Sequence, residues 1–157
     1  MRSAVLEERM TNNTQDLQIA FQFGEAALRE GEALLAQATM PTFNNTNGLY
    51  VFVPPSDTTT LFEPRWNDPS TQWRDAGITG DATLGYARAQ YIIEQMPQAV
   101  IPPPPGRTAP GQSLQSDKEV VARTIIVYRI TARAWGATGR DNPTPMVVLQ
   151  STFQRGA

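Results

Sequence analysis

Two carboxylates in the first quarter of the chain have the residue type and spacing that acid–base chemistry requires. Glu25 and Glu32 lie seven residues apart in a stretch rich in Ala, Leu and Glu, so in a helix they share one face. Paired carboxylates act as general acid and base when their surroundings separate their pKa values. No cleft-forming motif accompanies this pair, and a solvated helix face is the simpler interpretation.

The rest of the composition removes most other chemistry. The 157 residues include no His and no Cys, which excludes thiolate nucleophiles, disulfides, His-based proton transfer and the usual zinc sites. The Gly136–Gly139 stretch leads into a proline-containing turn, so it does not open the helix that a phosphate loop requires. The sequence therefore predicts that the protein is not an enzyme and has no catalytic residue, cofactor or metal.

Tryptophans and a proline run offer binding chemistry instead. Trp66, Trp73 and Trp135 would suit a sugar-binding platform, but anchoring of loops to the body is the commoner role of tryptophan in a small domain. Pro102–Pro105 is a stiff, extended run. Such runs are ligands for aromatic grooves, although a rigid loop is the simpler interpretation here.

Length and charge bound the class of protein. The chain is long enough for one domain, residues 1–157, with 40% hydrophobic residues and a net charge of −2. A net negative charge does not favour electrostatic binding to nucleic acid. The longest apolar runs are a few residues, too short for a membrane span.

A long helix is predicted over residues 1–38, which contain no proline and many good helix formers. Apolar and small residues recur there at alternating steps of four and three, which is typical of an amphipathic helix. We expect this stripe to form the core face of the helix: Leu17, Phe21, Gly24, Leu28, Gly31 and Leu35.

Such a helix is longer than the body it would pack against. It spans roughly 50 Å, whereas a domain of this size has a radius of gyration of about 15 Å. Its first turns must therefore project from the body or dock on a partner. The residues that we expect to contact a partner are Val5, Leu6, Glu7, Glu8, Arg9 and Met10.

The remainder of the chain predicts a late antiparallel sheet. Residues 39–87 are rich in turns, with a short candidate strand at Leu49–Val53. Residues 88–155 carry the sheet, interrupted by a proline-rich loop at residues 102–117. A strand is favoured over a helix from Gln90 onward, with Tyr91 and Ile93 on one face. Strict alternation of apolar and polar residues then predicts a hairpin within Val127–Phe153, with Tyr128 to Ala134 facing the core at every second position.

Both ends of the chain resemble a known family. Leu6-Glu7-Glu8-Arg9-Met10-Thr11-Asn12-Asn13, with Ala20-Phe21-Gln22 and Glu25-Ala26-Ala27-Leu28-Arg29 after it, resembles the N-terminal helix of PilX-type minor pilins of type IV pili. The C-terminal YRITARAWG and Val147–Phe153 are similar to that family's closing strands. The middle of the chain, residues 41–117, carries no matching motif.

The resemblance implies an α+β protein with the type IV pilin fold: a long N-terminal helix packed on a C-terminal antiparallel sheet of about four strands. It also implies a hydrophobic N-terminal segment that anchors such proteins in the bacterial inner membrane. That segment is missing here, so we expect a truncated soluble form whose native protein passes from inner membrane and periplasm to the extracellular pilus.

The function that the resemblance implies is structural. A minor pilin would associate with other minor pilins, and with the major pilin or a tip adhesin, to prime pilus assembly at or near the tip. The loops at residues 54–83 and 102–117 would set partner specificity. Two alternatives stay open: a minor pseudopilin of a type II secretion system, and an adhesion or aggregation module displayed on the pilus.

Overall fold

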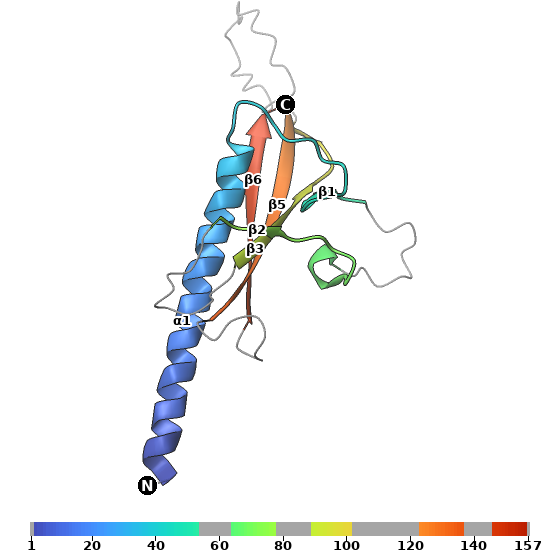
Figure 1. Cartoon of the computed structure of the whole chain (residues 1–157). Coiled ribbons are helices and arrows are strands. Elements are labelled where there is room, and N and C mark those ends of the chain that lie inside the picture. Colours follow the sequence, from blue (N-terminus) through green and yellow to red (C-terminus); the bar gives the residue numbers. More distant parts are fainter. Residues whose placement is uncertain (1, 54–63, 78–88, 102–122, 137–145, 157) are drawn as a thin grey trace, which may run out of the picture.

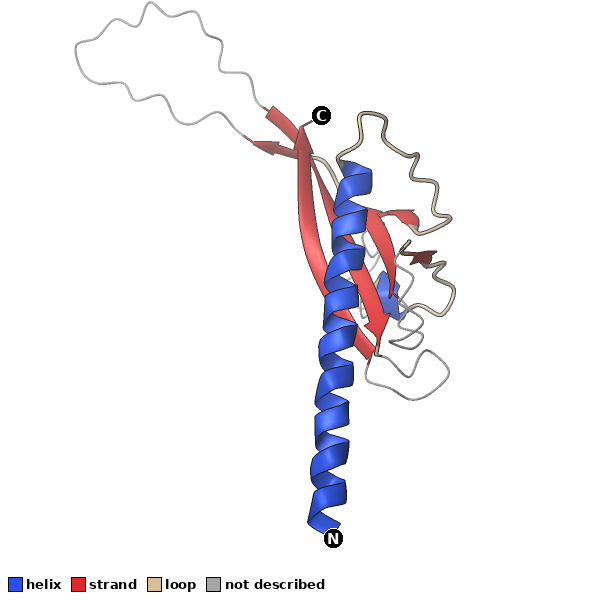
Figure 2. Ribbon diagram, turned by 60° about the vertical axis from the view of Figure 1, so that its left-hand side comes forward, coloured by secondary structure: helices blue, strands red, loops and turns tan. Residues whose placement is uncertain are grey.

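The computed structural model describes residues 2–53, 64–77, 89–101, 123–136 and 146–156. One long helix lies along one face of a twisted sheet, and its N-terminal half extends beyond the sheet (Figures 1 and 2). This arrangement confirms the predicted α+β class and the long helix packed on a sheet.

Helix α1 runs from Arg2 to Leu35, which is 34 residues, and ends slightly before the predicted boundary at residue 38. Glu, Ala, Leu and Gln dominate it, and all four favour the helix. The run Thr11–Thr14, whose residues have low helix propensity, is helical throughout. There the hydroxyls of Thr11 and Thr14 each donate to the carbonyl four residues earlier, at 2.9 Å. This back-bonding satisfies the hydroxyls without leaving the helix.

The sheet has six strands among the described residues, and the largest three run through its centre. Strand β5 is central: β6 pairs along one of its edges, while β3 and the short β4 pair in succession along the other. The short β1 and β2 then pair with β3. The strands are β1 (Leu49–Val51), β2 (Arg74–Asp75), β3 (Ala89–Gln95), β4 (Ala99–Ile101), β5 (Arg123–Trp135) and β6 (Met146–Gly156), with a 3-10 turn η1 at Arg65–Asn67.

The structure differs from the predicted antiparallel sheet of about four strands in two respects. The sheet holds more strands, because β1, β2 and β4 are short segments that add to its edges. It is also mixed, because β1 pairs parallel to β3. A parallel pair needs a long crossover, and the residues between Val51 and Ala89 supply one.

The hairpin and the third major strand are confirmed. Strands β5 and β6 pair antiparallel from Ile125 opposite Gly156 to Trp135 opposite Met146. β3 begins at Ala89, so the strand interpretation from Gln90 onward holds against the helical one. The predicted alternation also holds: Tyr128, Ile130, Ala132 and Ala134 are all buried in the core.

The core lies between α1 and the inner face of the sheet. Small residues let the helix approach closely: a methyl carbon added at Gly24 or Gly31 would lie 2.9 Å from Leu149 Cδ1 or 2.8 Å from Ile130 Cγ2, respectively. The helix residues that are buried there are Ala20, Gly24, Ala27, Gly31 and Leu35, with Leu28 partly buried at the margin.

The interpretation of Leu17 and Phe21 as core residues is wrong, because they are 48% and 47% exposed. The face that meets the sheet is centred between Ala20 and Gly24. Phe21 is rotated about 60° away from Gly24, to the outside of that face. Leu17 follows Asp16. A carbon added at Gly136, the residue after β5, would lie 2.8 Å from the Asp16 carbonyl oxygen. This position is near the end of the sheet, so little remains to cover Leu17.

Candidate partner-binding surface

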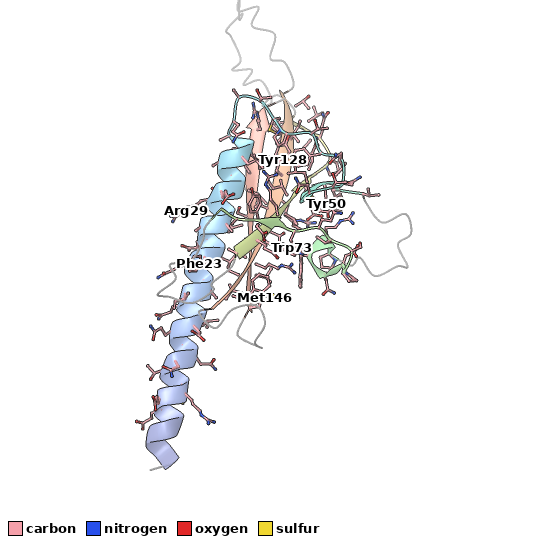
Figure 3. The ribbon with its side chains drawn as sticks, in the orientation of Figure 1. Phe23, Arg29, Tyr50, Trp73, Tyr128 and Met146 are labelled. Carbon is pink, nitrogen blue, oxygen red and sulfur yellow. The ribbon has the colours of Figure 1, made fainter. Side chains whose placement is uncertain are left out.

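The N-terminal half of α1 leaves the body of the protein. Every described side chain from Glu7 to Gln15 is exposed, and the helix continues below the sheet with its side chains in solvent (Figure 3). Helical packing on the sheet therefore stabilises only the second half of α1, where its contacts with β3, β5 and β6 lie.

The structure brings the predicted partner residues together on this free half. Glu7, Glu8, Arg9 and Met10 are exposed, and Met10 is 69% exposed although it is apolar. Val5 and Leu6 lie on the helix backbone, while their side chains lie outside the described part. Among the described residues of the sheet and its connecting segments, none covers Met10.

Leu17 and Phe21, which were predicted to be core residues, extend this surface. The sequence analysis did not predict this. Met10, Leu17 and Phe21 follow at steps of seven and four, which places them on one side of a helix. We call these three residues the exposed stripe. Leu6 lies four residues before Met10, at the next position of the same series. An apolar stripe of this kind, open to solvent on a long helix, is a surface for another helix or an apolar partner.

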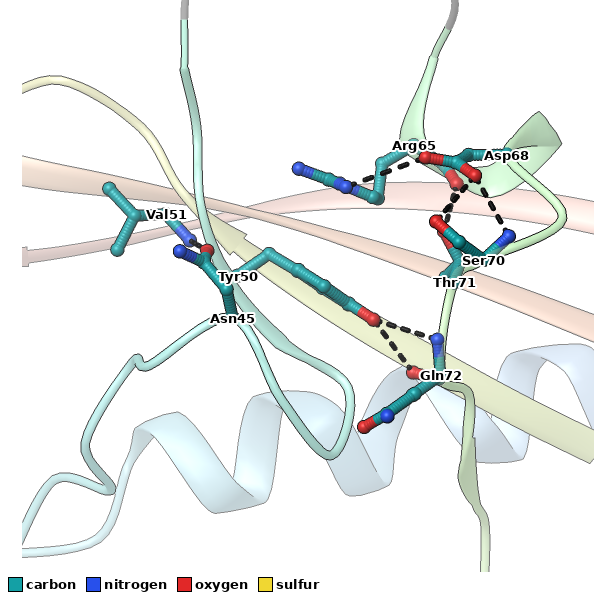
Figure 4. Close-up of polar contacts among 8 residues, drawn as sticks. All are labelled: Asn45, Tyr50, Val51, Arg65, Asp68, Ser70, Thr71 and Gln72. Atoms are coloured by element: carbon teal, nitrogen blue, oxygen red, sulfur yellow. Dashed lines mark hydrogen bonds and ion pairs between the residues drawn. The ribbon is translucent and has the colours of Figure 1, made fainter.

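A second surface lies on the outer face of the sheet, where the segment of residues 64–77 is held down by Tyr50 of β1. The Tyr50 hydroxyl accepts from the backbone N–H of Gln72 at 2.7 Å and lies 3.3 Å from its carbonyl (Figure 4). The guanidinium of Arg65 lies over the Tyr50 ring, 4.7 Å from its centroid. These contacts fix η1 and the turn after it against the sheet.

The turn after η1 is built on Asp68. Its carboxylate accepts from the Ser70 hydroxyl at 2.7 Å and from the Ser70 N–H at 2.8 Å, and it pairs with Arg65 at 3.6 Å (Figure 4). The two hydrogen bonds from Ser70 lower the pKa of Asp68 below its ordinary value, with a smaller contribution from the charge of Arg65. Asp68 is therefore ionised at neutral pH.

The outer face of β3 and β5 carries two charged networks. Glu94 is 3% exposed and receives a hydrogen bond from Arg129 Nε at 2.9 Å. Arg129 Nη2 lies at the same distance from that carboxylate, as an ion pair without hydrogen-bond geometry. Gln90 bridges the second network, because its side chain donates to Asp75 and accepts two bonds from Arg133.

Two tryptophans flank Arg133. Its guanidinium lies 3.9 Å from the centroid of the Trp73 ring and 5.1 Å from that of Trp135, distances at which cation–π attraction operates. Trp135 is buried and Trp66 and Trp73 are half-buried, and the contacts of Trp73 and Trp135 with Arg133 agree with an anchoring role for these two. Trp66 and Trp73 nevertheless keep part of their surface open.

These residues border a groove of about 470 Å³ on the outer face. Strands β5 and β6 supply its floor and the turn after η1 supplies its wall. We call it the tryptophan groove; it is lined by Trp66, Asn67, Asp68, Pro69, Thr71, Trp73, Arg133, Met146 and Val148. The strand alternation had already placed Arg133 and Trp135 on one face, but the approach of the turn was not visible from the sequence.

The candidate catalytic carboxylates do not form a pair. Glu32 accepts a hydrogen bond from the Ser151 hydroxyl at 3.1 Å, whereas Glu25 is exposed and lies 4.0 Å from Arg29. Within the described ranges, no group of three or more acidic residues is placed to hold a metal ion. No helix in the described part is both long and apolar enough to cross a bilayer.

A sheet packed against the C-terminal half of a long helix, whose N-terminal half remains uncovered, is an architecture consistent with the pilin class. A model of the family described as "Type IV pilus assembly protein PilX C-term" matches residues 31–155. The chain therefore belongs to the PilX family of type IV pilus assembly proteins, as its resemblance predicted. No curated protein and no solved structure matches it.

The match begins in the last turn and a half of α1 and continues through the sheet. The N-terminal residues that carried the other half of the resemblance lie before it. Because the family is one of type IV pilus assembly, the match favours that system over the secretion pseudopilus and gives the protein a structural role.

Proposed function

We propose that this protein is a minor pilin that joins other minor pilins through the free half of α1 and primes pilus assembly at or near the tip. The observation that carries the proposal is the exposed stripe. Met10, Leu17 and Phe21 keep 69%, 48% and 47% of their surfaces in solvent, on a helix that the sheet leaves uncovered.

The exposed stripe favours association because apolar surface in contact with water is unfavourable in free energy. Burial of apolar surface contributes about 25 cal/mol per Å² removed from water, and a second amphipathic helix would cover the stripe by ridge-and-groove packing. The predicted partner residues Val5, Leu6, Glu7, Glu8, Arg9 and Met10 lie on the same free half. Glu7, Glu8 and Arg9 then supply charges at the rim, which set orientation more than affinity.

The partners that the proposal implies are other minor pilins, the major pilin and a tip adhesin, with the protein in the inner membrane and periplasm before assembly and extracellular afterwards. Membership of a type IV pilus assembly family supports the pilus partners. The adhesion alternative depended on loops at residues 54–83 and 102–117. Apart from residues 64–77, these loops lie outside the described part of the chain.

The test is binding of this domain to the soluble domains of the minor pilins encoded beside it, by size-exclusion co-elution and calorimetry. Leu17→Asp should weaken the complex by about tenfold or more, because it places a charge in an apolar contact. Gln22→Asp is the matched control, since Gln22 is exposed on the same helix and points about 140° away from Leu17. Equal loss of binding in both variants would contradict the proposal.

A further inference from the structure

The tryptophan groove has donors and apolar surface of the kind that an extended peptide requires. Trp66 and Trp73 are half-buried, and each indole has one N–H donor. Among the described residues, neither indole N–H donates a hydrogen bond to the chain. Asn67 beside them is exposed, and its amide adds two further donors.

Proline-rich segments match this chemistry. A polyproline II helix makes no internal hydrogen bonds, so its carbonyls remain free to accept from a partner. Its stiffness also keeps the entropic cost of binding low, and aromatic-lined grooves are the recurring receptors for it. An aromatic groove that also presents N–H donors therefore fits a polyproline segment better than a featureless apolar ligand.

The chain itself contains such a segment. Strand β4 ends at Ile101, and the sequence continues as four prolines, a glycine and Arg107. The arginine supplies a positive charge two residues after the last proline. The groove is lined by the carboxylate of Asp68, with which Arg65 pairs at 3.6 Å, and by the guanidinium of Arg133. Asp68 is the acidic side chain of this lining, and it offers Arg107 an opposite charge.

The segment cannot reach the groove of its own chain. Ile101 pairs with Arg123 at the start of β5, whereas the groove lies at Arg133, ten residues further along the strand. Ten strand residues span about 33 Å. The six residues from Pro102 to Arg107 reach at most about 20 Å from Ile101. The prolines, which come first, reach still less far, so a groove that binds them must belong to another copy.

We propose that the tryptophan groove of one copy binds residues 102–107 of a second copy. The prolines pack on Trp66 and Trp73, and the guanidinium of Arg107 approaches the carboxylate of Asp68. The segment follows Ile101 at one end of the sheet and the groove lies at the other. Two copies aligned antiparallel therefore exchange both contacts, whereas copies aligned head-to-tail make one contact each and extend in one direction. It is separate from the helix contact proposed above.

The first test is fluorescence polarisation with a labelled peptide of residues 99–108 and the whole chain. Saturable binding is expected with a dissociation constant below about 1 mM. Trp66→Ala should weaken it by about tenfold or more. Phe21→Ala is the matched control, because Phe21 is a half-exposed aromatic residue on α1 and should leave the affinity unchanged. Thermal melting checks that both variants are folded.

The charge contact has its own readout. Asp68→Asn should weaken binding of the natural peptide but not of a peptide with Arg107→Gln, so the two changes should not be additive. A Leu6→Asp chain should bind the peptide normally, and a Trp66→Ala chain should still bind partner pilins. These two results separate the groove from the helix surface, so failure of one proposal is distinguishable from failure of the other.

A mixture of two variants, one without the groove and one without the proline segment, tests whether the contact forms between two copies of the chain. The Trp66→Ala chain keeps its proline segment, and a chain with Pro103→Ala and Pro104→Ala keeps its groove. In sedimentation velocity, the wild type should self-associate with increasing concentration, and each variant alone should remain monomeric. Their mixture should form a one-to-one dimer and nothing larger.

Three results would overturn the proposal: no saturable peptide binding up to about 1 mM, peptide affinity unchanged by Trp66→Ala, or no heterodimer in the mixture of variants. Binding of an N-acetylglucosamine tetramer that Trp66→Ala abolishes, with no peptide binding, would also overturn it and would make the groove a glycan site.

Discussion

At the scale of single residues, Gly24 and Gly31 show how closely the helix approaches the sheet and how differently two glycines are used. Beside Gly31 stands Ile130 Cγ2, a methyl on a β-branched side chain in the buried centre of the sheet. Beside Gly24 stands Leu149 Cδ1, the far end of a partly exposed side chain. A β-branched side chain has little freedom at χ1, so only Leu149 is able to move away.

This difference predicts opposite outcomes for the same substitution. Gly31→Ala should lower the free energy of unfolding by about 1–2 kcal/mol, because overpacking costs more than the roughly 1 kcal/mol gained in helix propensity. Gly24→Ala should change it by less than about 0.5 kcal/mol, or raise it. Urea denaturation of both variants measures the difference. Equal destabilisation would mean that Leu149 is held as firmly as Ile130.

Tyr91 predicts the behaviour of the protein at alkaline pH. Burial raises the pKa of Tyr91 above its ordinary value, and nearby Arg74 opposes that shift in part. A raised folded pKa means that the unfolded chain loses its proton first. The stabilisation is therefore complete below the unfolded pKa, about 10, and is lost as pH rises from there through the folded pKa. Burial raises the pKa of Tyr128 in the same direction.

Thermal melting between about pH 8 and about pH 11 tests this linkage. The melting temperature should fall across the upper part of that range, and Tyr91→Phe should reduce the fall. The chain suits this measurement because Lys118 is its single lysine, so few other groups titrate there. An identical alkaline decline in Tyr91→Phe would refute the linkage.

At the scale of elements, the C-terminal end of α1 is stabilised from outside the helix. Its last turn contains no basic residue, although cations there offset the helix dipole. Arg155 of β6 supplies the charge instead, because its Nη1 donates to the carbonyls of Leu35 and Gln37 at 2.8 Å each. The last strand of the chain thereby fastens the end of the first helix.

Arg155→Ala should therefore lower the free energy of unfolding by about 1–3 kcal/mol, as expected for hydrogen bonds that involve a charged group. Arg29→Ala is the control, since Arg29 is exposed and its contact with Glu25 is long. Its effect should stay below about 0.5 kcal/mol. Equal effects of the two arginine changes would show that the carbonyl contacts of Arg155 add nothing to stability.

The elements that the sequence predicted are those with long, regular patterns. Seven alternating residues from Tyr128 to Ala134 define both faces of β5, and the proline-free run defines α1. The short β1 was predicted within Leu49–Val53, but its parallel pairing was not predictable, because its partner strand lies about forty residues away. The core face of the helix was predicted wrongly at Leu17 and Phe21, because large apolar residues were assigned to the core. In the structure the small residues Ala20 and Ala27 pack against the sheet instead.

The two candidate surfaces also differed in how far the sequence predicted them, because one depends on a single segment and the other on several. The projecting residues followed from the ratio of helix length to domain size, which is a property of one segment. The tryptophan groove depends on β5, β6 and the turn after η1, which meet only in the folded chain. Its tryptophans were visible in the sequence, but their arrangement around Asp68 and Arg133 was not.

At the scale of the whole molecule, two surfaces face different directions. The free half of α1 extends from one end of the body (Figure 1), and the groove lies on the face of the sheet away from the helix. The two proposed contacts would use these separate surfaces of one subunit. Membership of a type IV pilus assembly family agrees with this plan.

The measurement that tests the central claim most directly is the number of surface pili on cells whose chromosomal copy carries Met10→Asp, Leu17→Asp and Phe21→Asp together. All three side chains are exposed, so the domain should still fold and accumulate. We predict few or no pili in this strain and normal numbers in a matched Gln22→Asp strain. Normal pilus numbers in the triple variant, with the protein present at wild-type levels, would contradict the claim that the exposed stripe drives assembly.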